Sequence, residues 1–287
     1  MSEVCVGIYI HGNRNYFRMG EQAILSVLEY SDFDIFVFLG SGPRLNLPSF
    51  SRIQIKPYND LPQSRHRSER FLLKINALAH LLENTSHEWL ILLDADAIFA
   101  SAITKDRIVE DLADRPLGMV EQTTITGSNM TRKEFLDHYM NHSVAWISPG
   151  MVAPDLGHFR YYNAGVILGK RSEFAKFASW ALNIIENATG DHQVGEHMIA
   201  DQDYFQFWAN SLHPGCCTTL PWYWNHCEYW DSDFPRPEAL VLHFSNFCLG
   251  PDSRQIKRVR SLRKNGVLKA YSPALLRRIA RLVLGKR

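Results

Sequence analysis

The sequence predicts an α/β fold with a mostly parallel sheet that is flanked by helices. Short apolar runs of strand length alternate along the chain with longer segments whose apolar residues repeat at helical spacing. The most apolar run, Trp89–Ala100 (WLILLDADAIFA), ends abruptly in two aspartates that stand one residue apart. That pattern is typical of a buried central strand whose carboxyl end leaves the sheet.

The elements can be assigned in chain order from these periodicities. Helices are recognised by stripes such as Leu72, Ile75, Leu78 and Leu82, and strands by short apolar runs that end in turn residues. The predicted strands are Val4–Ile10, Asp34–Leu39, Arg52–Ile55, a run that ends at Asp94, Leu117–Val120, Tyr161–Gly169 and Ala239–His243. The predicted helices are Met19–Tyr30, Ser68–Leu82, Ser172–Ile185 and His197–Trp208. The stretch from Thr123 to Phe159 is polar, aromatic and rich in turn residues, which predicts a long functional loop.

Composition excludes several classes of protein. The 287 residues are 46% hydrophobic and 21% charged, which is ordinary for a globular protein, and no run of about 18 apolar residues predicts a transmembrane helix. The N-terminus lacks the basic region of a secretion signal, and the five cysteines show no C-x-x-C spacing. We therefore expect a cytoplasmic protein with reduced thiols.

Charge is distributed unevenly along the chain. From Arg254 to Arg287 there are 12 lysines and arginines and no acidic residue, whereas the first 253 residues carry an acidic excess of 11. The segment Pro273–Leu284 also has an apolar stripe beside its arginines, which suits an anionic membrane surface. Packing of this helix on the acidic body is the alternative, and no nucleic-acid recognition motif accompanies the charge.

The two aspartates that follow the apolar run predict a cation site. Ionised carboxylates are costly to bury without compensation, and Asp94 and Asp96 arrive at the carboxyl edge of the sheet, where α/β proteins bind ligands. A hard ion such as Mn²⁺ or Mg²⁺ prefers oxygen ligands and keeps substrate phosphates in its shell. Capping of the next helix is the alternative explanation.

Three further segments place polar residues where they could join that site. Asn163 and His243 stand at strand ends, as the two aspartates do, and His243 could be a third metal ligand. Asp201-Gln202-Asp203 opens a helix, where acidic residues can equally serve as first-turn caps.

These motifs together resemble the nucleotide-sugar glycosyltransferases of the GT-A type, and among them glycosyltransferase family 8, over about residues 4–250. The resemblance rests on motifs that occur in the family's order: Gly12-Asn13-Arg14-Asn15-Tyr16, Arg70 and Lys74, LLDADAIF, YYNAGVIL, ADQDYFQFW, Trp222-Tyr223-Trp224-Asn225 and LHFSNFCLGP. It implies a GT-A catalytic domain over residues 1–252, with a donor half at about 1–122 and an acceptor half at about 123–252, followed by a basic tail at 253–287.

The resemblance also implies a function, namely retaining transfer of galactose or glucose from a UDP-sugar to a saccharide or lipid-linked acceptor. It assigns Mn²⁺ or Mg²⁺ to Asp94, Asp96 and His243, and a stabilising role near the anomeric carbon to Gln202, with Asp201 and Asp203 orienting sugar hydroxyls. The implied donor-binding residues are Asn13, Arg14, Asn15, Tyr16, Arg70, Lys74, Asp94, Ala95, Asn163, Ala164 and Gly165. The implied acceptor-binding residues are Trp222, Trp224 and Asn225.

Other functions stay open on the sequence alone. The blood-group-like retaining galactosyl- and N-acetylgalactosaminyltransferases share the plan but carry Asp-Glu where this chain has Asp201-Gln202. A haloacid-dehalogenase-like phosphatase would use Asp94 as its nucleophile, and a non-catalytic sugar-binding protein would keep the fold without turnover. Peripheral association with the inner face of a membrane is an open alternative to a purely cytoplasmic location.

Overall fold

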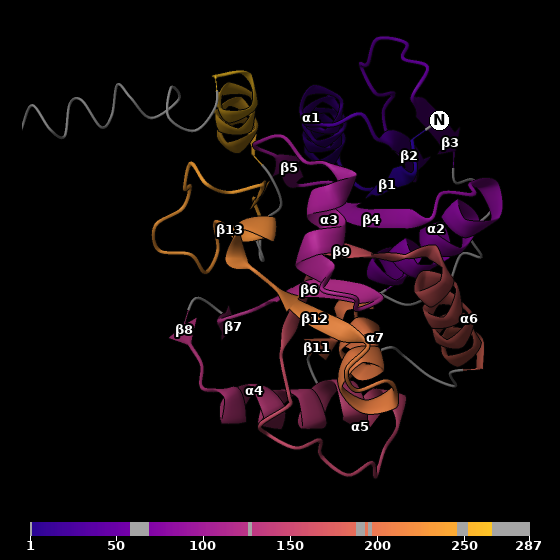
Figure 1. Cartoon of the computed structure of the whole chain (residues 1–287), viewed down its shortest axis with the longest axis vertical. Coiled ribbons are helices and arrows are strands. Elements are labelled where there is room, and N and C mark those ends of the chain that lie inside the picture. The colour runs from indigo at the N-terminus through magenta and orange to yellow at the C-terminus, as the bar shows by residue number, and fades with distance from the viewer. Residues whose placement is uncertain are drawn as a thin grey trace, which may run out of the picture.

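Seven strands form the central sheet, and all of them except β9 run in the same direction (Figure 1). The order across the sheet is β12 (Cys217–Leu220), β6 (Leu117–Glu121), β9 (Tyr162–Lys170), β4 (Trp89–Asp94), β1 (Val4–Ile10), β2 (Asp34–Leu39) and β3 (Ile53–Pro57). This computed structural model describes residues 2–57, 69–125, 128–187, 193–194, 197–245 and 252–265. The predicted α/β class and its mostly parallel sheet are confirmed.

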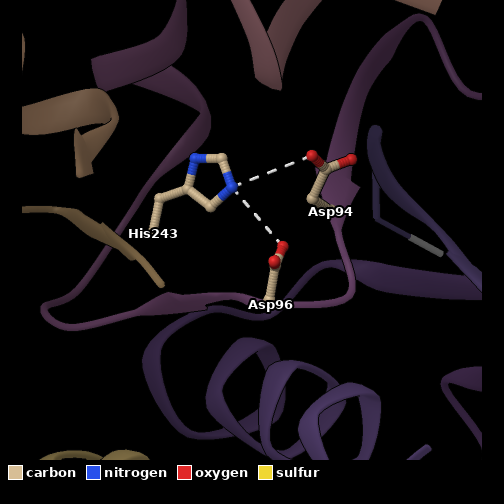
Figure 2. Close-up of side chains that lie close together, drawn as sticks. All are labelled: Asp94, Asp96 and His243. Atoms are coloured by element: carbon tan, nitrogen blue, oxygen red, sulfur yellow. Dashed lines mark ion pairs between the residues drawn. The ribbon is translucent and has the colours of Figure 1, made fainter. Parts of the chain in front are cut away.

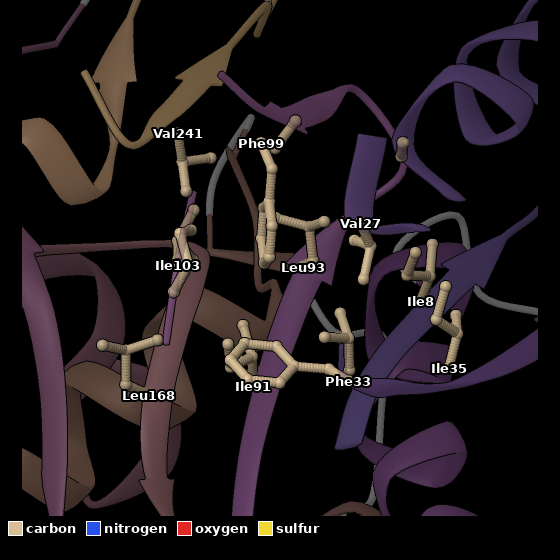
Figure 3. Packing of buried hydrophobic residues seen from close by; sticks show 14 of the residues in the cluster. Ile8, Val27, Phe33, Ile35, Ile91, Leu93, Phe99, Ile103, Leu168 and Val241 are labelled. Atoms are coloured by element: carbon tan, nitrogen blue, oxygen red, sulfur yellow. The ribbon is translucent and has the colours of Figure 1, made fainter. Parts of the chain in front are cut away.

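Helices cover both faces of this sheet because its strands are apolar on both sides. Ile91 and Leu93 of β4 face a core shared with α1 (Arg14–Tyr30) and α3 (Lys105–Leu112), part of which Figure 3 shows. Leu90 and Leu92 face the opposite core, which is shared with α2 (Glu69–Asn84), α6 (Arg171–Asn187) and α7 (Asp201–Phe207). Successive side chains of a strand point to opposite faces, so a continuous apolar run is what a central strand between two helical layers requires.

A small three-stranded sheet joins the end of β4 to the last strand of the domain. In it β14 (Val241–His243) lies between β13 (His226–Cys227) and β5 (Ala97–Phe99). The antiparallel register pairs His243 with Ala97, and the backbone N–H of Phe244 donates to the carbonyl of Asp96 at 2.9 Å. Backbone pairing therefore brings His243 beside the two aspartates.

In the central sheet, a bulge interrupts the pairing of β9 with β6. Met119 pairs with Ile167, but the next residue, Val120, pairs with Asn163, so three residues of β9 have no partner on β6. Bulges of this kind bend a strand and redirect its side chains, often next to active sites. Here the bulge contains Ala164 and Gly165, which were predicted to contact the donor.

Two sequence predictions of local structure are wrong in part. The stretch from Thr123 to Phe159 contains helix α4 (Arg132–Tyr139), a π-helical turn at Met140–Val144 and the short α5 (Ala145–Ile147), because a capping box at Thr131 and Glu134 starts a helix there. Helix α7 begins at Asp201 rather than at His197, because the Asp203 carboxylate accepts the backbone N–H of Ala200 and caps it there. The described residues also contain two short hairpins, β7–β8 (Thr124–Ile125, Ser128–Asn129) and β10–β11 (Gln193–Val194, His197–Met198), a π-helical turn at Trp208–Leu212 and the 3₁₀ turn Trp222–Trp224.

A helix over residues 253–265 packs on the body through one apolar side. Ile256, Val259 and Leu262 are buried against Leu242 and Phe244 at the last strand of the domain. The predicted helix Pro273–Leu284 lies outside the described residues. Among the helices that the structure describes, none is long and apolar enough to cross a bilayer.

Candidate functional site

The two aspartates and the histidine converge at the carboxyl edge of β4 (Figure 2). His243 Nε2 lies 3.4 Å from Asp96 Oδ1 and 3.8 Å from Asp94 Oδ2, and one ligand atom from each residue falls within 4.8 Å of the others. These separations are longer than direct hydrogen bonds. Neighbouring ligands of an octahedral ion with bonds of about 2.1 Å stand roughly 3 Å apart, so a small contraction would close this set around Mn²⁺ or Mg²⁺.

The Lys74 side chain places a positive charge beside the carboxylates at this edge of the sheet. Its ammonium lies 2.6 Å from Asp94 Oδ1 and 3.2 Å from Asp201 Oδ2, and it donates to the carbonyl of Ala164 at 2.5 Å. With Asp96, the site holds three carboxylates and one ammonium, which leaves two negative charges when these four groups are ionised and the His243 ring is neutral, as a metal ligand must be. A divalent cation would neutralise that remainder.

The charges of the site depend on one another. Burial opposes the charged form of Lys74, but Asp201 and Asp94 outweigh it and raise the pKa of Lys74 above its usual value. Burial would raise the pKa of Asp96, but His243 holds it below its usual value. Burial also opposes the charged form of His243, and Cys227 and Asp96 nevertheless hold its pKa well above the usual range. Burial raises the pKa of Asp201 despite the charge of Lys74.

Gln202 lies beside this edge in the first turn of α7, with its side chain held by three hydrogen bonds. Its Oε1 accepts from Asn163 Nδ2 at 3.1 Å and from the backbone N–H of Ala164 at 3.3 Å. Its Nε2 donates to Gln122 Oε1 at 3.3 Å. Both the carbonyl and the amino end of this amide are therefore fixed in orientation.

The two aspartates that flank Gln202 have different surroundings. Asp201 pairs with Lys74 and so belongs to the charged edge of the site. Asp203 uses Oδ2 to accept the Ala200 N–H at 2.8 Å and Oδ1 to accept the Ser143 hydroxyl at 2.5 Å. This buried side chain therefore caps α7 and fixes it against the π-helical turn, and its role in orienting sugar hydroxyls stays a prediction.

The predicted nucleotide loop follows β1 and lies at the same edge of the sheet as Asp94, since Tyr9 of β1 is paired with Asp94. Asn13 caps α1 by accepting the N–H groups of Asn15 and Tyr16 at 2.8 and 3.3 Å. Arg14 stands exposed in the first turn of that helix, and Tyr16 is half-buried. Arg70 lies in the first turn of α2, and its side chain is outside the described residues.

The predicted acceptor residues are separated by the structure. Trp222 is 37% exposed and stacks on the Arg236 guanidinium, so it remains available to a ligand. Trp224 is wholly buried, and its Nε1 donates to Asp111 at 2.7 Å. Asn225 is 1% exposed and faces the interior of the site. Trp224 and Asn225 are therefore buried side chains with partners inside the protein, and their acceptor contacts stay predictions.

Sequence reasoning missed one residue of the site and the packing contact of another. Gln122 directly follows β6 and accepts hydrogen bonds from Asn163 and Gln202, and a polar residue just after a buried strand was the available signal. Gly165 was predicted to contact the donor, but it packs under the His243 ring, where a Cβ would lie 2.6 Å from Nδ1.

Comparison with known proteins identifies the fold. No protein-family model matches the sequence, and no curated protein matches it. Among solved structures, the galactosyltransferase LgtC in complex with donor and acceptor sugar analogues superposes with a TM-score of 0.56 at 16% identity, over 91% of this chain and 95% of that chain. An active-site mutant of LgtC with glutamate in place of glutamine gives 0.52 at 13% identity, over 89% and 95%.

The bifunctional glycosyltransferase WbbM, in its apo form, gives a TM-score of 0.62 at 14% identity and is matched over 94% of this chain but only 51% of its own length. This chain has the fold of these glycosyltransferases. The predicted GT-A fold is thereby confirmed.

Proposed function

We propose that this GT-A protein is a divalent-metal-dependent, retaining glycosyltransferase that moves galactose or glucose from a UDP-sugar to a saccharide or glycolipid acceptor. The observation that carries the proposal is the convergence of Asp94, Asp96 and His243 at the sheet edge, beside an oriented Gln202. LgtC, which shares the fold, is a galactosyltransferase solved with donor and acceptor sugar analogues. The phosphatase alternative loses support because the fold is that of glycosyltransferases.

The donor would lie along the carboxyl edge of β1 and β4. Asp94, Asp96 and His243 would hold Mn²⁺ or Mg²⁺, which supplies Lewis-acid stabilisation of the leaving diphosphate when bound. Lys74 keeps Asp94 and Asp201 in place and lowers the repulsion between them. The loop Asn13–Tyr16, with Arg70, is proposed to contact the nucleotide.

Gln202 is proposed to act as a fixed dipole near the anomeric carbon. Two donors occupy its Oε1, so the lone pairs that a nucleophile would use are already engaged. An amide is a weak nucleophile in any case. We therefore favour attack of the acceptor on the face that UDP leaves, with a UDP oxygen as the base and the developing sugar cation stabilised by this carbonyl. That path retains the configuration of the donor sugar.

The acceptor is proposed to be lipid-linked. The helix over residues 253–265 turns an exposed basic side to solvent and buries its apolar side on the body. The exposed cations are Arg254, Lys257, Arg260 and Lys264. Such a surface would hold the enzyme at an anionic membrane, where each nearby basic residue contributes about 1 kcal/mol.

A donor panel tests the proposed function. UDP release from UDP-galactose and UDP-glucose should require Mn²⁺ or Mg²⁺, should stop in EDTA, and should be lost in Asp94→Ala, Asp96→Ala and His243→Ala. Asp155→Ala is the matched control, because Asp155 is an exposed loop carboxylate whose partners are the nearby Gly157 backbone and His158, away from the metal ligands. Proton NMR of the fresh product should show the α-configuration of the donor. Full activity in EDTA, or a β-linked product, would refute the proposal.

A further inference from the structure

An unbroken chain of side-chain hydrogen bonds connects His243 to Gln202. His243 Nδ1 lies 2.9 Å from Asn225 Oδ1, and Asn225 Nδ2 donates to Asn163 Oδ1 at 2.7 Å. Asn163 Nδ2 in turn donates to Gln202 Oε1 at 3.1 Å. Gln202 and Asn163 both donate to Gln122 Oε1 at 3.3 Å, and Gln122 Nε2 donates to the carbonyl of Thr124. These side chains come from positions spread over residues 122–243.

Backbone groups determine the direction of every bond in this chain. The N–H of Gly165 donates to Asn163 Oδ1 at 2.8 Å, so the other end of that amide must be its donor. The Ala164 N–H fixes Gln202 Oε1 in the same way, and the Thr124 carbonyl fixes Gln122 Nε2. An N–H can only donate and a carbonyl can only accept, so none of these three amides can be turned round without losing a bond.

The orientation of Asn225 in turn determines which ring nitrogen of His243 is protonated. Because Asn163 Oδ1 is an acceptor, Asn225 must present Nδ2 to it and therefore Oδ1 to His243. His243 Nδ1 must then carry a proton. In the neutral ring this leaves the lone pair on Nε2, which points at Asp94 and Asp96 (Figure 2). Hydrogen bonding of one ring nitrogen is how proteins select the nitrogen that binds a metal.

The geometry points to Asn225 as a positioning residue that serves two parts of the site at once. Its oxygen selects the His243 tautomer that can bind a metal through Nε2, and its amino group holds Asn163, which orients Gln202. Asn225 is 1% exposed, and its side chain bonds to His243 and Asn163 within the protein. This inference rests on the proposed function for the role of Gln202, whereas its metal part concerns this chain alone.

Mn²⁺ binding without any sugar nucleotide tests the metal part. Asn225→Leu removes both bonds, and we expect its Mn²⁺ dissociation constant, measured by EPR titration, to rise about 10- to 100-fold. Asn210→Leu is the matched control: Asn210 is also a buried asparagine with several hydrogen bonds, but its partners are Arg160 and Gln206. That variant should bind Mn²⁺ like the wild type. Equal affinity in a folded Asn225→Leu protein would overturn the inference.

Isosteric variants keep the inference testable if Asn225→Leu does not fold. Asn225→Asp retains the acceptor for His243, so Mn²⁺ should bind at least as tightly as in the wild type. Asn163→Asp retains the acceptor for Asn225 and Gly165 but loses the donor to Gln202, so it should bind Mn²⁺ normally and turn over UDP-sugar at least tenfold more slowly. In ¹⁵N-histidine NMR of the Mg²⁺-loaded wild type, His243 should show a protonated Nδ1.

The outcomes separate this inference from the proposed function. If no UDP-sugar is turned over but Mn²⁺ affinity follows this pattern, the positioning of the metal ligand stands and the glycosyltransferase proposal fails. If UDP-sugars are turned over but Asn225→Asp weakens Mn²⁺ binding as much as Asn225→Leu, the proposal stands and the inference fails. A protonated Nε2 in the Mg²⁺-loaded protein would also overturn it.

Discussion

Gly165→Ala is the smallest change that should disable the metal site. A Cβ at Gly165 would lie 2.6 Å from His243 Nδ1 and 2.9 Å from Asn163 Oδ1, whereas ordinary contacts of a Cβ begin at 3.4 Å. The nearest ring atom, His243 Cε1, would lie only 2.3 Å from that Cβ, so the ring would have to retreat by about 1.1 Å. The His243 ring is 3% exposed and hydrogen-bonded to Asn225, so this movement would disturb a buried and packed side chain.

Gly165→Ala should lower both the free energy of unfolding and the affinity for Mn²⁺. Overpacking of a well-filled interior typically costs about 1–3 kcal/mol of the free energy of unfolding. His243 Nε2 lies 3.4 Å from Asp96 Oδ1 and 3.8 Å from Asp94 Oδ2. Moving this nitrogen away from the two carboxylates should weaken Mn²⁺ binding by about 10- to 100-fold, which is the range seen when a residue that supports a metal ligand is removed. Turnover at low Mn²⁺ should fall in the same proportion.

Gly118→Ala is the control that separates the loss of stability from the loss of Mn²⁺ affinity. A Cβ at Gly118 would meet the Cδ2 atoms of Leu112 and Leu220, both at 2.8 Å, and so imposes a similar clash in the apolar core away from the metal ligands. Thermal melts should show comparable destabilisation of the two variants, while EPR titration should show weaker Mn²⁺ binding only in Gly165→Ala. A folded Gly165→Ala protein with wild-type Mn²⁺ affinity would refute the reasoning.

Three further predictions follow from other parts of the chain. Lys74→Met leaves Asp201 without its buried cation, so the free energy of unfolding in urea should fall by about 3–5 kcal/mol, with part of the loss recovered by Mn²⁺; no recovery would contradict the charge balance. Burial, with a smaller contribution from the charge of Asp34, raises the pKa of the Cys5 thiol from 9.0 to about 12. As pH rises above 9, the thiol therefore ionises in the unfolded chain before it ionises in the folded protein, and the free energy of unfolding falls. Between pH 9 and 12, urea unfolding should show a slope up to about 1.4 kcal/mol per pH unit steeper in the wild type than in Cys5→Ala, and equal slopes would contradict this. Lys257→Glu with Lys264→Glu should reduce co-sedimentation with anionic liposomes at least tenfold at low salt and leave neutral liposomes unaffected; unchanged binding would argue against the membrane surface.

Much of the framework could be predicted from the sequence because it depends on local patterns. The run of apolar residues up to Asp94 demands burial on both faces, and a strand between two helical layers is the simplest way to supply it. The helices were predicted where apolar stripes were strong, as in α2 and α6. The segment from Thr123 to Phe159 was missed because its helices are short and its signal is a capping box rather than a stripe.

The site was predictable only to the extent that its residues stand at strand ends. Asp94, Asp96 and His243 follow apolar runs, and their convergence could be expected from topology alone. Burial of Trp224 and Asn225 could not be expected, because exposed and buried aromatic segments look alike in sequence. The bulge in β9 was equally hidden, since it depends on the pairing with β6 and not on any local signal.

The bulge explains why this site needs its particular polar residues. By taking three residues of β9 out of register, it frees the N–H groups of Ala164 and Gly165 from the β6 ladder, and these groups bond to Gln202 Oε1 and Asn163 Oδ1. A buried N–H without an acceptor is costly, so an amide side chain at each position stabilises the bulge as well as the site. The amides are thereby oriented by the fold, and the metal-binding face of His243 follows from that orientation.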